Sequence, residues 1–240
     1  MTVPSPEQIF AALHATWPPA SIRERDGWTL RTGLGGGQRV SAASRDGGGA
    51  PGDIAAMEAA QSALDQPSLV MVRDDQGTLD KALATGGYEK KDPTIALIAP
   101  VTEITGPEAP LAAYPSWPAL AVQEEIWNAA GVGTARRNVM ARVQGAKTAL
   151  LGRVEDAPVA TAFVAIDHDI AMVHALEVAP EAQRKGFGRS MMRAAARWSA
   201  DVGARWLAVL VVEANAPAIA LYSDLGMHAV TRYHYRRAPE

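Results

Sequence analysis

The hydrophobic positions in the second half of the chain follow first one period and then another. Short apolar runs separated by turn residues predict an antiparallel meander of three strands over 148–154, 159–166 and 170–178. Two segments before the meander, near 117–130 and 135–143, carry apolar residues at helical spacing and are expected to be amphipathic helices. The pattern therefore predicts two helices followed by a sheet.

Beyond the meander, the pattern alternates between helix and strand. From Gly188 onward the apolar residues recur at helical spacing, at Met191, Met192, Ala195, Trp198 and Val202. Residues 205–212 are continuously apolar, which suits a strand covered on both faces. A helix is expected over 215–226 and a last strand over 228–237. The order helix, helix, three strands, helix, strand, helix, strand predicts an α/β fold of the mixed, α+β kind.

A glycine-rich, basic loop joins the meander to the long helix. Residues 173–178 read as a buried strand that ends at Pro180, and Gln183-Arg-Lys-Gly-Phe-Gly188 then leads into the first helical turn. The first N–H groups of a helix have no internal partner and the helix dipole is positive there, so an anion site is expected. Gly186 and Gly188 are expected to allow positive φ and close approach of a ligand. The loop lacks the Gly-Lys-Ser/Thr of a Walker P-loop and the third glycine of a dinucleotide fingerprint.

A second motif lies on the helix expected over 215–226. Asn215 is a good N-cap, Pro217 fits an early helical position and Gly226 is a good terminator. Tyr222 lies within this helix, directly after Leu221.

The two motifs resemble those of the GNAT superfamily of acyl-CoA-dependent N-acyltransferases. The loop is similar to the family's pyrophosphate-binding Gln-x-x-Gly-x-Gly, and the second motif is similar to its Asn-x-x-Ala-x-x-Leu-Tyr-x-x-x-Gly-Phe, with Met227 replacing Phe. The resemblance covers 113–240 and implies the GNAT fold, a mixed twisted sheet with helices on both faces. The family usually closes with two strands, whereas one follows here. The missing strand is expected from the N-terminal half or from a second subunit, which leaves a homodimer open.

The resemblance implies acetyl-CoA as co-substrate and assigns residues to it. An amide near Val178 is expected to polarise the acyl carbonyl, Asn215 to contact the pantetheine arm, and Tyr222 to protonate the departing thiolate. The residues expected to bind acetyl-CoA are Leu176, Val178, Gln183, Arg184, Lys185, Gly186, Phe187, Gly188, Arg189 and Asn215.

The catalytic base is expected to be Glu177 or His174. Glu177 lies on the strand beside the expected acyl site, where burial would raise the pKa of its carboxyl group. His174 has a suitable intrinsic pKa, and some family members use a histidine at about this place. Because a strand alternates faces, residues 174 and 177 should point opposite ways unless a bulge intervenes. We favour Glu177.

The first half carries its own set of elements, ending at a proline-rich stretch over 102–118 that is the expected linker. Its expected helices cover 5–17, 53–65 and 79–85, and its expected strands cover 28–31, 38–43, 68–73 and 94–99.

The first half resembles a degenerate copy of the second. Its strand, helix, Gly-Gly-Tyr and strand over 68–99 repeat the order found over 205–237. Where a CoA loop would stand, residues 46–52 carry an acid, no cation and a proline that lacks an N–H. We therefore expect tandem domains, with a degenerate GNAT-like domain at 1–105 that shapes the acceptor side and a GNAT acetyltransferase domain at 113–240.

Composition excludes several classes of site. The chain has 240 residues, 48% hydrophobic, and a formal charge of −3, which suits a packed core and argues against a broad nucleic-acid surface. There are no cysteines, which excludes disulfides, thiolate metal sites and a cysteine nucleophile. The five histidines are scattered and no metal is expected. No leader or bilayer-length apolar run is visible, so a cytoplasmic protein without a membrane partner is expected.

Two functions from different classes fit these residues. The first is an N-acetyltransferase that moves an acetyl group from acetyl-CoA to a primary amine of a small molecule or peptide, by direct attack in a ternary complex. The second is an acyl-CoA-binding pseudoenzyme or sensor that regulates a partner protein. Retention of Tyr222 and Glu177 favours catalysis, because a sensor needs no proton donor.

Overall fold

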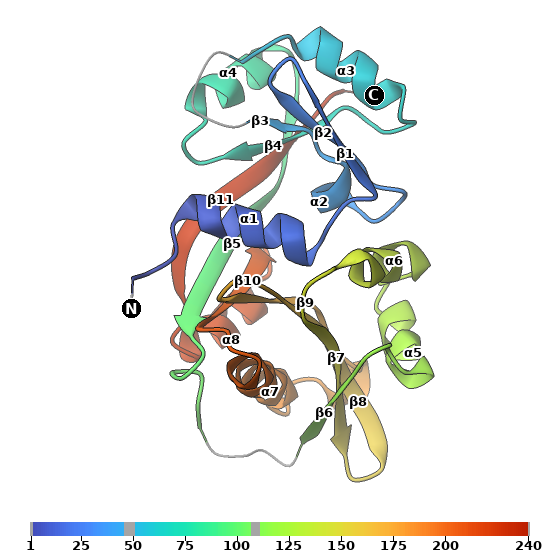
Figure 1. Ribbon diagram of the computed structural model, residues 1–240, viewed down its shortest axis with the longest axis vertical. Coiled ribbons are helices and arrows are strands. Elements are labelled where there is room, and N and C mark those ends of the chain that lie inside the picture. The colour runs from blue at the N-terminus through green and yellow to red at the C-terminus, as the bar shows by residue number, and fades with distance from the viewer. Residues whose placement is uncertain (1, 46–50, 107–110, 240) are drawn as a thin grey trace.

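The computed structural model describes residues 2–45, 51–106 and 111–239 (Figure 1). The first half contains α1 (Pro6–Thr16), β1 (Ser21–Arg25), β2 (Trp28–Thr32), α2 (Gln38–Ser41), β3 (Ser44–Arg45), α3 (Ile54–Ser62), β4 (Leu69–Arg73), α4 (Gly77–Thr85) and β5 (Glu89–Pro100). The second half contains β6 (Ala112–Ser116), α5 (Ala121–Ala129), α6 (Thr134–Arg142), β7 (Lys147–Val154), β8 (Ala157–Asp167), β9 (Ile170–Val178), a 3₁₀ turn at Pro180–Ala182, α7 (Phe187–Asp201), β10 (Trp206–Val212), α8 (Ala216–Asp224) and β11 (His228–Arg237).

One eight-stranded sheet, in the order β4-β11-β5-β10-β9-β8-β7-β6, runs through both halves of the chain. All its neighbouring pairs are antiparallel except β9 and β10, so the sheet is mixed, as expected. A smaller sheet, β1-β2-β3, meets β4 through a parallel bridge between Ala43 and Val70. The predicted meander is confirmed as β7, β8 and β9.

The strand that the second half lacks comes from the first half. β5 lies between β10 and β11, and β11 in turn lies between β5 and β4. Figure 1 shows β5 and β11 running side by side between the upper and lower parts of the molecule. Each half therefore inserts its last strand into the sheet of the other half. The sheet therefore contains strands from both sides of the expected domain boundary at 105–113. The boundary itself stays a prediction.

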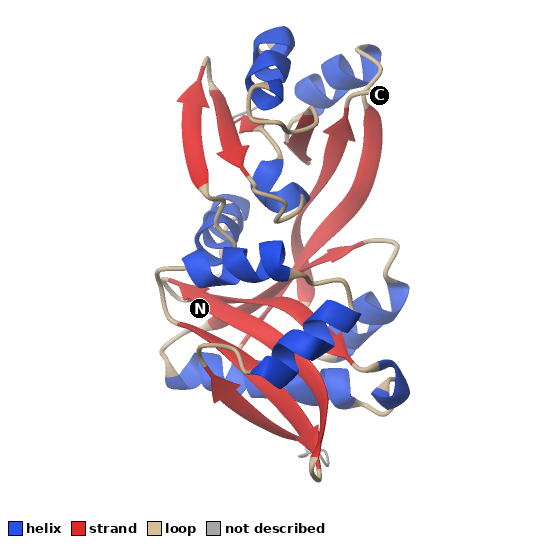
Figure 2. Ribbon diagram, turned by 90° about the vertical axis from the view of Figure 1, so that its right-hand side faces the viewer, coloured by secondary structure: helices blue, strands red, loops and turns tan. Residues whose placement is uncertain are grey.

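Helices cover both faces of the central strands (Figure 2). On one face, α1 and α5 pack on β8 and β9, around buried side chains that include Phe10, Trp127 and Phe163. On the other face, α7 packs on the same strands through Met191 and Met192. These two cores confirm the predicted layers. A third cluster, around Trp28, Met57, Val70, Leu83 and Tyr88, holds the upper part of the first half together.

Local signals explain where the helices begin. Ser5 and Gln8 form a capping box at the start of α1, with Pro6 as its first residue. At α8, the Asn215 side chain accepts a hydrogen bond from the Ala218 amide. No helix in the described ranges is long and apolar enough to cross a membrane.

The structure differs from the sequence-based expectations at three points in the first half and the linker. The strand predicted over 38–43 is wrong, because Gln38–Ser41 forms α2, which starts after Gly37 at a φ of +97°. The strand β1 was not predicted, because all five of its residues are exposed and carry no apolar alternation. The expected linker contains β6, whose Pro115 is tolerated because β6 is an edge strand.

We predict that the strand exchanged from the first half stabilises the whole sheet. Ile98 on β5 is fully buried between β10 and β11, so Ile98→Ala should lower the free energy of unfolding by about 2–5 kcal/mol. Chemical denaturation monitored by circular dichroism measures this change. Ile22→Ala on β1, where the side chain is 52% exposed, is the matched control and should change stability by less than about 0.5 kcal/mol. Equal effects of the two substitutions would contradict the prediction.

Candidate active site

The candidate site opens where β9 and β10 separate. The two strands pair in parallel only as far as Val173 and Val209. Beyond these residues β9 continues along β8 to Val178, while β10 continues along β5 to Val212. A gap between the diverging strands follows from this register.

The backbone of Val178 faces this gap. The Ala179 amide donates to the Val159 carbonyl, which belongs to β8. Because successive amides of a strand point to opposite sides, the Val178 amide points away from β8 and toward the gap. The carbonyl of Val178 accepts a hydrogen bond from the Gln183 side chain at 3.1 Å. An N–H donor is thus aimed at the place where an acyl oxygen was expected.

A cavity of about 760 Å³, the loop cavity, lies between the start of α7 and α8. Of the residues predicted to bind acetyl-CoA, those that line it are Leu176, Val178, Gln183, Arg184, Gly186, Phe187, Gly188, Arg189 and Asn215. Tyr222 and Glu177 also line it, whereas Lys185 does not. The structure therefore brings the two sequence motifs together around one space.

The loop conformation presents backbone amides to the loop cavity. Gly186 has a φ of +83° and Arg184 a φ of +63°, and the first helical hydrogen bond of α7 runs from the Ser190 amide to the Gly186 carbonyl. The amides before Ser190 are therefore outside the helical ladder, at the positive end of the helix dipole. Gly188 does not have a positive φ; a Cβ there would lie 3.2 Å from Leu221, so this glycine allows α7 and α8 to approach each other.

Two of the polar residues on the rim have local structural partners. Arg189 forms an ion pair with Asp224 at 2.7 Å, and both side chains are partly exposed. Asn215 caps α8 through the Ala218 amide at 3.2 Å. A ligand phosphate near Arg189 would share the guanidinium with Asp224.

Tyr222 is nearly buried at the inner end of the loop cavity. Burial, followed by the negative charge of Glu177, raises the pKa of the Tyr222 hydroxyl to about 12. Tyr222 therefore carries its proton at neutral pH, which is the state that a proton donor needs.

A second cavity of about 430 Å³, the histidine cavity, lies on the other side of Glu177. His174 and Glu177 both line it, although strand alternation would place them on opposite faces. A bulge intervenes: Ala175 has a φ of +46°, and the pairing with β8 shifts between His174 and Glu177. The Ala175 carbonyl accepts a hydrogen bond from the Trp127 indole at 2.8 Å, which fixes the bulge.

His174 is held as a neutral imidazole. Burial, and then the charge of Arg39, lowers its pKa well below the ordinary value. Its Nε2 lies 2.9 Å from the Thr16 hydroxyl, which itself donates to the Ala12 carbonyl, so Nε2 carries the proton. The Trp17 ring packs beside the imidazole, with centroids 4.8 Å apart. A ring this buried is a weak base, and it shapes the cavity wall.

Glu177 is the carboxylate shared by both cavities. Burial raises its pKa, while the positive charge of Arg136 acts in the opposite direction. Glu177 is half-buried and lines both cavities.

Several residues of the histidine cavity were not identified from the sequence. They are Trp17, Arg39, Asp92, Arg136, Tyr233 and Tyr235, and half of them come from the first half of the chain. The glycine-rich segment 33–37 also reaches this wall through Gly36 and Gly37. The signal available in the sequence was Arg39, a cation two residues after the glycine-rich loop, which was expected to lie on a strand.

The described residues contain no group of three or more His, Cys, Asp or Glu side chains that could hold a metal ion.

Comparison with solved structures supports the same fold. A GCN5-related N-acetyltransferase from Kribbella flavida is similar over 97% of this chain and 95% of its own, with 19% identity and a TM-score of 0.72. A functionally unknown conserved protein from Staphylococcus epidermidis is similar over 93% and 96%, with 10% identity and a TM-score of 0.69. A tandem GNAT protein from the clavulanic acid biosynthesis pathway is similar over 76% and 68%, with 15% identity and a TM-score of 0.58.

No curated protein matches the sequence. Residues 101–227, more than half of the chain, match the acetyltransferase (GNAT) family. This match confirms the expected family and spans the loop, α7, β10 and α8 that build the loop cavity. The chain belongs to the GNAT family of acetyltransferases.

Proposed function

We propose that this protein transfers an acetyl group from acetyl-CoA to a primary amine by direct attack in a ternary complex. The observation that carries the proposal is the meeting of the loop cavity and the histidine cavity at Glu177, where β9 and β10 separate. Two spaces that share one carboxylate can hold two substrates against each other, so that the reaction needs no covalent enzyme intermediate.

Acetyl-CoA is assigned to the loop cavity and the amine to the histidine cavity. The amides at the start of α7 would bind the diphosphate, and the Val178 amide would donate to the acetyl carbonyl oxygen. The amine nitrogen attacks the carbonyl carbon, the C–N bond forms and the C–S bond breaks. The amine attacks as the neutral base, after its first proton has been lost to solvent, and the second proton, which the nitrogen loses on attack, passes to Glu177. The departing sulfur receives a proton from Tyr222, which then regains one from Glu177.

The negative charge of Glu177 raises the pKa of Tyr222, so proton uptake by Glu177 and proton release by Tyr222 are linked. A phenol with a pKa of about 12 is a weak donor to a thiolate whose conjugate acid has a pKa of about 8.5. Part of that raised pKa comes from the negative charge of Glu177. When Glu177 takes up the amine proton, its charge disappears and Tyr222 becomes a stronger acid at the moment when the thiolate leaves.

We also propose the tandem arrangement expected from the sequence, with a degenerate GNAT-like domain at 1–105 and an acetyltransferase domain at 113–240. Apart from the short helix α2 between β2 and β3, the order β2, β3, α3, β4, α4, β5 of the first half repeats β8, β9, α7, β10, α8, β11. β10 pairs in parallel with β9, and β4 forms a parallel bridge with Ala43, directly before β3. The likeness to a tandem GNAT protein supports this arrangement. The loop at 46–50 lies outside the described residues.

The alternative of a CoA-binding sensor predicts binding without turnover. A protonated Tyr222 and a carboxylate of raised pKa on opposite sides of the same gap favour catalysis, because regulation through CoA binding requires neither group.

We predict that purified protein releases free thiol from acetyl-CoA when a suitable amine is present, and that Tyr222→Phe slows this release. Loss of the proton donor should lower kcat by about 10²–10⁴-fold while leaving the dissociation constant for CoA unchanged. A thiol-trapping assay measures the rate and calorimetry measures CoA binding. Tyr114→Phe on β6, where the side chain is 54% exposed, is the matched control. CoA binding without turnover on any amine would favour the sensor, and absence of CoA binding would exclude both functions.

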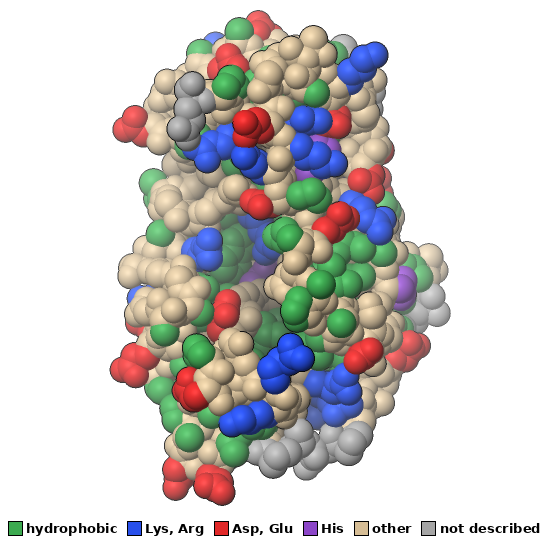
Figure 3. Space-filling model, turned by 180° about the vertical axis from the view of Figure 1, so that it is seen from behind, with side chains coloured by type: hydrophobic (Ala, Val, Ile, Leu, Met, Phe, Trp, Pro, Cys, Tyr) green, Lys and Arg blue, Asp and Glu red, His purple; other side chains and the backbone are tan. Residues whose placement is uncertain are grey.

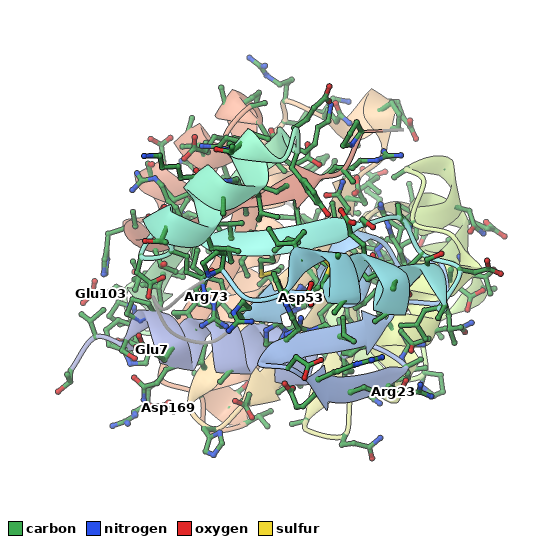
Figure 4. The ribbon with its side chains drawn as sticks, turned by 90° about the horizontal axis from the view of Figure 1, so that it is seen from above. Glu7, Arg23, Asp53, Arg73, Glu103 and Asp169 are labelled. Carbon is green, nitrogen blue, oxygen red and sulfur yellow. The ribbon has the colours of Figure 1, made fainter. Side chains whose placement is uncertain are left out.

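We predict that Glu177 sets the acid limb of the pH–rate profile. Its active form is the carboxylate, and burial raises its pKa, so kcat/KM should fall as pH drops through that raised pKa. Glu177→Gln should lower kcat/KM by about 10²–10⁴-fold above this pKa and should abolish the acid limb. Rates measured across a pH series test both effects. Glu103→Gln, an exposed carboxylate labelled in Figure 4, serves as control. An acid limb that persists unchanged in Glu177→Gln would assign the base elsewhere.

A further inference from the structure

The charges around the histidine cavity indicate what kind of amine it accepts. Two arginines, Arg39 from α2 and Arg136 from α6, line the cavity together with Glu177. In the part of the chain that the structure describes, neither arginine forms an ion pair with a carboxylate. The cavity therefore contains two cations that form no direct ion pair in the described part of the chain, although the carboxylates Glu177 and Asp92 line it as well.

Arg39 has both the position and the free donors to bind an anion. Its Nε donates to the Tyr233 hydroxyl at 3.3 Å and its Nη2 donates to the Leu210 carbonyl at 2.9 Å. Both partners are neutral, and these bonds use two of the five N–H donors of the guanidinium. The side chain is anchored at one edge while the remaining donors stay available, which is the geometry that a planar carboxylate matches.

The charge of Arg39 acts at the centre of the proposed reaction. It lowers the pKa of His174 and opposes the rise in the pKa of Tyr222, so the guanidinium lies within electrostatic reach of both sides of the gap. Arg136, whose Nε lies near Gly37, acts in the same way on Glu177. Because Arg39 and Glu177 line the same cavity, an anion bound at Arg39 and an amine directed at Glu177 would share one space.

The cavity has the volume of a small-molecule site, and aromatic rings form part of its wall. Its volume of about 430 Å³ falls within the usual range for small ligands. Trp17, Tyr233 and Tyr235 supply buried rings, and Asp92 is an exposed acid at the edge. Figure 3, which views the molecule from behind, shows a hollow near the middle, with hydrophobic side chains inside it and basic side chains on its rim.

We propose that the acceptor is a primary amine that also carries a carboxylate, as in a free amino acid, with the carboxylate bound by Arg39 and the amine directed at Glu177. The assignment rests on the acetyl transfer proposed above and names its substrate class. A polycationic acceptor would leave Arg39 without an anionic partner.

Matched pairs of amines test the proposal on the unaltered protein. Each pair consists of an amino acid and its carboxamide, and the series includes glycine, β-alanine, 4-aminobutyrate, leucine and phenylalanine, with spermidine as a polycation. The best amino acid should exceed its own amide in kcat/KM by about tenfold or more, the size expected for a charge-assisted hydrogen bond. The amide carries the less basic amine and is better deprotonated at neutral pH, so this preference would arise against the intrinsic reactivity. Equal rates within every pair, or a preference for amides or spermidine, would overturn the proposal.

Substitution of Arg39 locates the carboxylate. Arg39→Met should lower kcat/KM for both substrates, because loss of the Arg39 charge raises the pKa of Tyr222 further. The loss for the preferred amino acid should exceed the loss for its amide by about tenfold or more. Arg23→Met is the matched control, since Arg23 is exposed on β1, away from both cavities, and is labelled at the periphery in Figure 4. A purely structural role for Arg39 would lower both rates alike and would contradict the proposal.

The acceptor class and the acetyl transfer can be refuted separately. Calorimetric titration with CoA checks that each variant keeps the loop cavity intact. If wild-type protein acetylates amines but ignores the carboxylate, the acceptor proposal fails and the acetyl transfer stands. If CoA binds and no amine of the series releases thiol, the acetyl transfer itself fails and the acceptor proposal falls with it. Should Arg39→Met not fold, the comparison of amino acids with amides on the wild-type protein decides the matter alone.

Discussion

The separation of β9 from β10 is the constraint on which the rest of the site depends. The two strands could continue their parallel ladder, yet β9 stays with β8 and β10 stays with β5 beyond Val173 and Val209. Both diverging ends keep a partner on their outer sides, so the only backbone groups left open are those that face the gap. β5 is essential to this arrangement, because without it β10 would have no outer neighbour. A strand from the first half of the chain therefore supports the opening that the second half uses.

The protonation states of the site residues depend on burial as much as on neighbouring charges. His174 is neutral because it is buried between Trp17 and α1, and Glu177 has a raised pKa because it is half-buried with no ion-pair partner at contact distance in the described part of the chain. Arg39 is permanently charged, so burial cannot neutralise it, and neutral acceptors at Tyr233 and Leu210 solvate it only in part. The cavity is thus bordered by the neutral imidazole of His174, the carboxyl group of Glu177 and the partly solvated guanidinium of Arg39. The partly solvated cation favours the binding of a molecule that carries a carboxylate.

The sequence predicts the second half of the fold well and the composition of the second cavity poorly. Apolar periodicity identifies the meander and α7, and the motifs place Gly186 and Tyr222 at one cavity, because these signals are local. The bulge at Ala175 could not be predicted, since it depends on a hydrogen bond from Trp127, 48 positions away in the chain. The same holds for β5, whose neighbours are set by long-range pairing, and for β1, whose exposed residues carry no hydrophobic signal. Arg39 was assigned to a strand, and only the tertiary arrangement brings it to the site.

The reciprocal exchange of β5 and β11 bears on what the first half, which we propose to be a degenerate GNAT-like domain, can contribute. If this domain binds no CoA, its role could be expected to be separate from catalysis. Here, however, its last strand completes the sheet beside β10, and its segment from Gly36 to Arg39 forms part of the histidine cavity. A substitution in the first half can therefore alter the reaction through either the width of the gap or the charge beside the amine, without contact with acetyl-CoA. The acceptor preference should accordingly depend on both halves, and the binding of acetyl-CoA mainly on the second.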